Sequence, residues 1–198
     1  MPQASPPADR PERLAADAHG IAAAAGLLRA GKLVAFPTET VYGLGADARN
    51  DLACAKVFEA KGRPTFNPLI VHLRDVEAAE GLAEFSSMAR DLAAAFWPGP
   101  LTLVLPLRSD HGLSSLVSAA LPTVALRVPQ NPVAQALLAE FDGPIAAPSA
   151  NRSGHLSPTQ ADHVMHSLSA GVAAVLDGGD CPVGLESTIV DASGRSAK

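Results

Sequence analysis

Cysteine is scarce in this sequence: Cys54 and Cys181 are the only two among 198 residues, and they stand far apart, outside any C-x-x-C pair. This scarcity excludes a zinc ribbon and a disulfide framework, and it fits a reducing compartment. Long apolar runs are also lacking, since none approaches the roughly 18 residues that a membrane helix needs. We therefore expect no membrane association and a cytoplasmic location.

The N-terminal end lacks the apolar core of a signal peptide. Residues 1–13 are instead rich in proline, alanine and charge, which predicts a disordered N-terminal tail. The remaining residues, 14–198, are enough for one domain with a sizeable core. Hydrophobic residues make up 47% of the chain and charged residues 18%, which is the composition of a globular protein.

An excess of positive charge is missing as well. The formal net charge is −5 at pH 7, which argues against bulk, non-specific binding of nucleic acid. A local basic patch is compatible with this net charge, so weak RNA binding stays open.

Short apolar runs alternate with helical patterns along the chain. Strands are expected at residues 33–36, 69–73, 101–105, 124–128, 145–147, 172–176 and 188–190. Helices are expected near residues 14–30, 51–61, 75–83 and 86–96, from Pro132 onward and from Ser157 onward. The last two strands should be joined by a turn at residues 177–180, and residues 108–122 are ambiguous. This irregular alternation predicts a mixed α/β (α+β) fold, with helices packed on a twisted mixed sheet.

Three motifs that resemble known sites fail on inspection. Residues 26–32 match G-x-x-x-x-G-K, but they end a helix and open a strand, which is the reverse of a phosphate-binding loop. The glycines at 43 and 45 do not open a helix, so a dinucleotide site is disfavoured. His163 and His166 lie on one helix face without a third ligand, so a solvated face is the better interpretation. No protein metal site is predicted.

Polar groups that follow apolar segments remain candidate binding residues. Lys61, Arg63 and Asn67 lie on a proline-stiffened loop, where a point charge and a donor fork suit phosphate. A solvated basic helix end explains them equally well. Ser149 and Asn151 follow a buried strand, so their side chains should emerge at the sheet edge and offer neutral hydrogen bonds. An ordinary turn is the alternative.

Further polar residues lie in or beside other apolar strands. The segment Thr38-Glu39-Thr40 follows one strand, and Glu186-Ser187-Thr188 precedes another. His72 is flanked by apolar residues, so it is either a core histidine or a ligand. Arg127 lies within a buried strand, where an unpaired guanidinium is costly. It should therefore meet an acidic partner or an anionic ligand.

Six motifs occur in one order along most of residues 14–191: FPTETVYGLG at 36–45, KGRP at 61–64 with NPL at 67–69, WPGPLT at 97–102, VALRVP at 124–129, APSAN at 147–151 and ESTIVD at 186–191. Together they resemble the YrdC family of threonylcarbamoyl-AMP synthases. The resemblance implies a YrdC-like domain over residues 14–198. It also implies ATP contacts from Arg63, Asn67, Thr123, Ser149, Asn151 and Ser157. It implies L-threonine contacts from Thr40, His72, Arg127, Ala147 and Ser187.

The resemblance further implies a reaction. L-threonine and bicarbonate or carbon dioxide form a carbamate, which attacks the α-phosphorus of ATP and releases pyrophosphate. Lys61 and Arg63 are implied in catalysis, with Mg²⁺ accompanying ATP, since phosphate charge grows during transfer. The product is expected to pass to a partner protein that modifies the adenosine beside the anticodon of tRNA.

One departure from the family concerns the end of the chain. Family members usually continue with a segment whose arginine helps to bind ATP, and Arg195 is not clearly placed to replace it. Either a compact variant or an incomplete ATP site is therefore expected. An RNA- or nucleotide-binding module, a carbamoyl-transfer domain of hydrogenase maturation and a paralogue with another substrate are the competing hypotheses.

Overall fold

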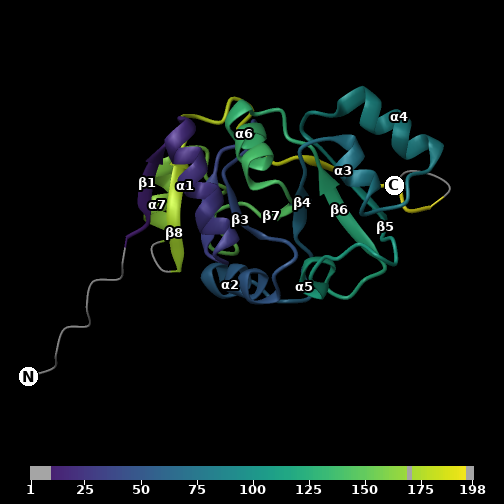
Figure 1. Ribbon diagram of the computed structural model, residues 1–198, viewed down its shortest axis with the longest axis horizontal. Helices are drawn as coiled ribbons and strands as arrows, with labels where there is room; N and C mark the ends of the chain where they lie inside the picture. Colours follow the sequence, from purple (N-terminus) through teal and green to yellow (C-terminus); the bar gives the residue numbers. More distant parts are fainter. Residues whose placement is uncertain (1–9, 169–170, 195–198) are drawn as a thin grey trace, which may run out of the picture.

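In the computed structural model, which describes residues 10–168 and 171–194, nine strands of the described chain form one mixed sheet (Figure 1). The strands are β1 (Glu12–Ala15), β2 (Leu33–Phe36), β3 (Gly43–Asp47), β4 (Ile70–His72), β5 (Leu101–Pro106), β6 (Thr123–Arg127), β7 (Ile145–Ala146), β8 (Val172–Asp177) and β9 (Thr188–Asp191). Their order in the sheet is β1-β8-β2-β3-β7-β4-β6-β5-β9. Parallel pairs such as β4 with β6 occur beside antiparallel pairs such as β5 with β6. The expected mixed sheet is therefore confirmed.

The helices of the described chain are α1 (Ala18–Arg29), α2 (Asp51–Lys61), α3 (Val76–Glu80), α4 (Ser87–Phe96), α5 (Ser115–Ser118), α6 (Pro132–Phe141) and α7 (Ala161–Ser167). Side-chain oxygens of Asp17, Asn50 and Asn131 cap the first turns of α1, α2 and α6. Each cap satisfies backbone N–H groups that the helix leaves unpaired. Over the described ranges, none of these helices is both long enough and apolar enough to cross a bilayer.

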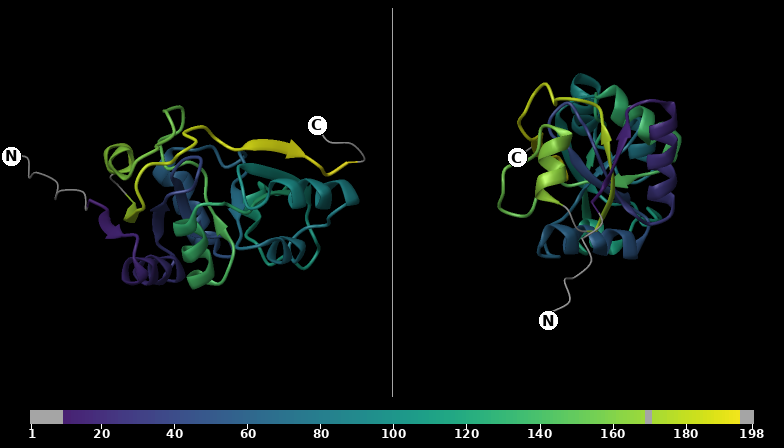
Figure 2. Two further views of the ribbon diagram at one scale, coloured as in Figure 1. Left: turned by 90° about the horizontal axis from the view of Figure 1, so that it is seen from above. Right: turned by 90° about the vertical axis from the view of Figure 1, so that its left-hand side faces the viewer.

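The sheet buries apolar side chains on both of its faces. In β2, Leu33 and Ala35 join one core, whereas Val34 and Phe36 join the other. Helices α1 and α6 cover the second face, and α2, α4 and α7 contribute to the core on the first. The end-on view shows α1 and α7 on opposite sides of the sheet (Figure 2, right). Burial on both faces explains why several strands read as continuous apolar runs.

The N-terminal part of the domain differs from the expectation. Leu14 was expected in a helix, but it lies in β1, which pairs in parallel with β8. Helix α1 begins only at Ala18, because the Asp17 side chain accepts a hydrogen bond from Gly20 there. The expected tail at residues 1–13 is therefore too long, since Glu12 and Arg13 belong to β1. Residues 1–9 lie outside the described part, as does Arg195.

Two expectations about the C-terminal third are wrong. Strands β8 and β9 are not joined by a tight turn, because they lie at distant places in the sheet order. Residues 178–187 instead run along the sheet, as the yellow segment in the left view of Figure 2 shows. Helix α7 begins at Ala161 and not at Ser157, and its cap residue Gln160 makes no side-chain cap bond. The Ser157 segment is a loop.

Candidate active site

Lys61 is the residue that joins the two main sequence motifs. It ends α2, and Gly62 follows in the left-handed conformation with φ of 58°. The Lys61 side chain is buried, and its ammonium donates hydrogen bonds to the backbone carbonyls of Ser149 and Asn151. The Lys61-Arg63 loop and the Ser149-Asn151 segment are therefore in direct contact.

The Lys61 ammonium loses its proton more readily than that of an exposed lysine. Burial, together with the neighbouring Arg63 guanidinium, lowers the pKa of this group from 10.5 to about 8, while Glu186 acts in the opposite direction. A cation that is both desolvated and near another cation gains stability when an anion arrives. The site is therefore suited to a phosphate.

The loop after Lys61 is closed by its own arginine. Arg63 donates from Nε to the carbonyl of Asn67 at 3.3 Å and from Nη2 to that of Pro68 at 2.9 Å. Partial burial lowers the Arg63 pKa. Asn67 is exposed at the tip of the same loop. Arg63 and Asn67 thus lie on one ordered turn beside Lys61, and their contact with ATP stays a prediction.

The remaining predicted nucleotide residues lie in different surroundings. Asn151 is buried, and its amide donates to the carbonyls of Arg152 and His155 at 2.9 and 2.7 Å, which shapes the following loop. Ser157 donates to Glu186 at 2.5 Å and borders a cleft of about 870 Å³. Thr123 begins β6, four residues and therefore about 13 Å from Arg127 at its other end. Nucleotide contacts by these residues also stay predictions.

The five predicted threonine-binding residues line a single small cavity. Its volume is about 40 Å³, and the lining also includes Ser149 and Glu186. The lining residues come from the ends of five separate strands, β2, β4, β6, β7 and β9, and their contact with threonine stays a prediction. These five residues are Thr40, His72, Arg127, Ala147 and Ser187.

The threonines beside this cavity have a defined hydrogen-bond direction. Thr38 Oγ1 donates to the carbonyl of Val41 at 2.7 Å. Its single proton is then in use, so the 2.8 Å bond between the Thr38 and Thr40 hydroxyls must be donated by Thr40. The lone pairs of Thr40 Oγ1 are left to accept a hydrogen bond from a ligand.

His72 lies deep in the cavity wall as a neutral imidazole. Burial lowers its pKa to about 3, and the nearby Arg127 cation acts in the same direction. Within the described residues, its Nδ1 atom is buried and has no hydrogen-bond partner. A buried polar atom of this kind is costly unless a ligand or water satisfies it. His72 is therefore better suited to a ligand than to a closed core.

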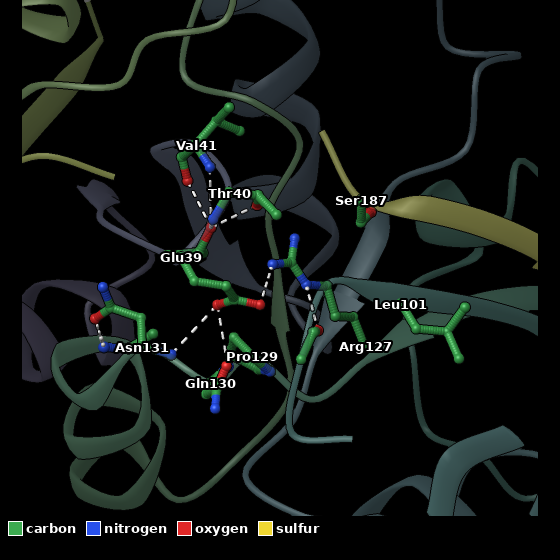
Figure 3. A network of polar contacts seen from close by, with 12 residues as sticks. Glu39, Thr40, Val41, Leu101, Arg127, Pro129, Gln130, Asn131 and Ser187 are labelled. Carbon is green, nitrogen blue, oxygen red and sulfur yellow. Dashed lines mark hydrogen bonds and ion pairs between the residues drawn. The ribbon is translucent and has the colours of Figure 1, made fainter. Parts of the chain in front are cut away.

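Arg127 meets the acidic partner that its burial required. Its Nη2 donates to Glu39 Oε1 at 2.7 Å, and its Nε donates to the carbonyl of Gly99 at 3.3 Å (Figure 3). Glu39 Oε2 accepts from the backbone N–H groups of Gln130 and Asn131. Sequence reasoning assigned no role to Glu39, although a lone acid between two apolar strands was the available signal.

The segment between β8 and β9 covers this cavity. Its backbone donates from Val183 to the carbonyl of Glu39 at 2.9 Å and from Gly184 to that of Thr40 at 3.1 Å. At its end, the Ser187 hydroxyl bonds that of Thr102 at 2.7 Å. These contacts bring Ser187 to the cavity from a strand far along the chain.

Fold and site together define an α/β ligand-binding domain, with a buried cation beside a polar cavity on a mixed sheet. The Sua5/YciO/YrdC family model, which carries the description "telomere recombination", matches residues 26–198. The chain belongs to this family.

Several relatives are similar over most of the chain. The threonylcarbamoyl-AMP synthase of Bacillus subtilis is 54% identical over 171 residues, which cover 86% of this chain and 49% of that protein. The threonylcarbamoyl-AMP synthase of Vibrio vulnificus is 34% identical over 154 residues, covering 76% of this chain and 82% of that protein. The crystal structure of Pyrococcus abyssi Sua5 complexed with L-threonine has a TM-score of 0.89 and 46% identity, and covers 94% of this chain and 55% of that one. The chain therefore spans about half the length of two of these relatives.

Proposed function

We propose that this chain forms threonylcarbamoyl-AMP from L-threonine, bicarbonate and ATP, as an L-threonylcarbamoyladenylate synthase. One observation carries the proposal: Ser149 lines the small polar cavity, and its carbonyl accepts a hydrogen bond from Lys61. The cavity proposed for threonine and the cation proposed for the phosphates thus share a residue. Such proximity is what a reaction between the two substrates needs.

The cavity offers complementary groups for an amino acid. The Arg127 guanidinium suits a carboxylate, and Thr40 Oγ1 can accept from the nitrogen that carries the carbamate. His72 Nδ1 and Ser187 supply further polar contacts without adding charge. That P. abyssi Sua5 has been crystallised in complex with L-threonine supports an amino-acid ligand for this cavity.

The phosphate side of the site would support the transfer step. A carbamate oxygen forms a bond to the α-phosphorus of ATP, and the bond from that phosphorus to the bridging oxygen of pyrophosphate breaks. Lys61 and Arg63 would stabilise the charge on the phosphates. Across the described residues there is no cluster of three or more metal-ligating side chains, so we propose that Mg²⁺ arrives bound to ATP.

The product and its destination complete the proposal. Threonylcarbamoyl-AMP is a mixed anhydride and hydrolyses easily, so it needs an acceptor close at hand. We propose a partner protein that transfers the threonylcarbamoyl group to the adenosine beside the anticodon of tRNA, with only weak RNA binding by this chain. Cys54 and Cys181 are both buried and free, which supports action in the reducing cytoplasm.

One assay tests this function. The protein is incubated with labelled ATP, Mg²⁺ and bicarbonate, with and without L-threonine, and pyrophosphate and adenylate are followed. Turnover should depend on both threonine and bicarbonate, and Lys61→Ala should reduce it by about 100-fold or more. Lys56→Ala is the matched control, because Lys56 lies on the same helix and donates to the carbonyl of Gly31, which is not part of the proposed site. Tight RNA binding without pyrophosphate release would defeat the enzyme hypothesis.

Substrate choice is tested in the same assay. Replacing L-threonine by L-serine removes one methyl group, which in an apolar contact is worth about 10-fold or more in specificity. Equal turnover with serine would show that the proposed amino-acid cavity is assigned wrongly.

A further inference from the structure

We propose that Glu39 is a positioning residue that orients Arg127 toward the carboxylate of the amino-acid substrate. This inference rests on the proposed function, because it takes the small polar cavity as the amino-acid site. Glu39 itself does not line that cavity, whereas Arg127 does. Glu39 therefore acts through the arginine and not through contact with substrate.

The two side chains form a buried ion pair. Only 4% of the Arg127 side chain and 8% of the Glu39 side chain are exposed, and the joining atoms are 2.7 Å apart. Each charge makes burial of the other tolerable, since an unpaired charge at such a site is strongly unfavourable. The pairing fixes the position of a long and otherwise flexible arginine.

Glu39 also decides which edge of the guanidinium is free. Arg127 uses Nε for the Gly99 carbonyl and Nη2 for Glu39. The third nitrogen, Nη1, points away from both partners, toward the side on which Thr40 and Ser187 lie (Figure 3). A carboxylate in the cavity would meet this nitrogen in one fixed direction, at little entropic cost.

A carboxylate is the only common side chain that meets all the surrounding groups. Oε1 faces the Arg127 donor, and Oε2 faces the N–H groups of Gln130 and Asn131 at the start of α6. A glutamine at this position would turn an NH₂ group toward one of these donors, whichever way its amide is flipped. The side chain has to be ionised glutamate to hold both partners.

The test compares binding of L-threonine with binding of L-threoninol, which has an alcohol in place of the carboxylate. Calorimetric titration of the wild-type protein should give tighter binding of threonine than of threoninol. Glu39→Gln should weaken threonine binding by about 10- to 100-fold, the effect of one hydrogen bond to a charged group, and leave threoninol binding nearly unchanged. The ratio of the two dissociation constants should therefore approach one. Glu84→Gln, a surface change at an exposed glutamate, is the control.

The outcomes separate this inference from the proposed function. If the wild-type protein binds no threonine, the proposed function fails. The inference is overturned if the wild-type protein binds threonine and Glu39→Gln keeps the preference for threonine over threoninol. It is also overturned if Glu39→Gln weakens the binding of both ligands equally, because Glu39 then has only a structural role. If Glu39→Gln does not fold, Glu39→Asp replaces it. The Glu39→Asp side chain keeps the charge but is too short to reach both partners. This variant should therefore also bring the ratio of the two dissociation constants closer to one.

Discussion

Among the individual residues of the site, Lys61 is buried, donates to two backbone carbonyls and lies near an arginine. Its pKa of about 8 lies below the usual 10.5, so part of the population is neutral at mildly alkaline pH. Phosphate groups beside it would favour the charged form and raise the pKa again. Nucleotide binding should therefore draw a proton from solution.

This proton uptake is measurable by calorimetry. At pH 8.5, titration of ATP in two buffers with different ionisation heats should show uptake of a fraction of a proton by the wild-type protein. At pH 6.5 Lys61 is already charged and contributes no uptake. Lys61→Met should abolish the part of the uptake that appears only at pH 8.5. The same uptake in that variant would show that Lys61 is not in contact with the nucleotide phosphates.

His72 gives a second prediction, on stability against pH. Its pKa is about 3 in the folded protein and 6.5 when exposed, so below pH 6.5 the unfolded chain binds a proton that the folded chain does not. Stability is lost as the pH falls through this window. Between pH 7.5 and 5 the wild type should lose about 2 kcal/mol more of its free energy of unfolding than His72→Leu, as measured by denaturant titration. Equal losses would mean that His72 is not a desolvated neutral group.

Individual site residues were predictable when they stood out chemically from their segment. Arg127 and His72 are polar residues inside apolar strands, whereas Lys61 ends helix α2 and Ser149 lies shortly after strand β7. Glu39 was not predictable in its role, because its partners Arg127 and Gln130 are about 90 residues away in sequence. A hydrogen-bond partner at that separation is set by the sheet and not by local pattern.

Within the strands and helices, the glycines differ in how much space surrounds the position of a Cβ atom. A Cβ on Gly45, in β3, would lie 2.9 Å from a Phe36 ring atom and 3.1 Å from Ile145 Cγ2. Gly26, in α1, has no atom within 4 Å of such a Cβ. The two positions therefore respond in opposite ways to the same substitution.

Thermal and denaturant unfolding test this contrast. Gly45→Ala should lower the free energy of unfolding by about 1–3 kcal/mol, because it overpacks the contact with β2 and β7. Gly26→Ala should raise it by about 0.5–1 kcal/mol, since alanine is the better helix former. A neutral Gly45→Ala would contradict the close approach of these strands.

The sequence did not indicate those strands whose formation depends on tertiary contacts. Strand β3 contains two glycines within five residues, which locally favours a turn, yet the close contact of Gly45 with Phe36 requires a glycine there. Strand β1 is short and half polar, and its pairing with β8 is not a local property. By contrast, the Asn131-Pro132 start of α6 was readable from sequence, because both its cap and its first residue are local.

In the molecule as a whole, the small polar cavity has less volume than the ligand proposed for it. Its volume of about 40 Å³ corresponds to about three water molecules, less than an amino acid requires. The covering segment at residues 181–187 is exposed over most of its length and is held by backbone hydrogen bonds to Glu39 and Thr40. We expect this segment to shift outward and close again around threonine.

Hydrogen exchange tests this movement. L-threonine should slow exchange at the Val183 and Gly184 amides by about tenfold, whereas amides in the remote helix α1 should stay unchanged. Unaltered exchange at residues 181–187 with saturating threonine would place the ligand elsewhere.

Chain order alone did not give the global arrangement of the strands. A mixed sheet followed from the irregular alternation of strands and helices, but its order, with β7 at the centre and β9 at the edge, depends on long-range pairing. The long connection from β8 to β9 is a consequence of that order. It is also what brings Ser187 to the same cavity as Thr40.

The most direct test of the central claim is detection of the product itself. The protein is incubated with ¹³C-labelled bicarbonate, L-threonine, ATP and Mg²⁺, and the reaction is followed by ¹³C NMR and mass spectrometry. We predict one ¹³C atom in an adduct of threonine and AMP, with a carbonyl carbon coupled to phosphorus. An adduct of threonine and AMP without the label, or no adduct at all, would contradict it.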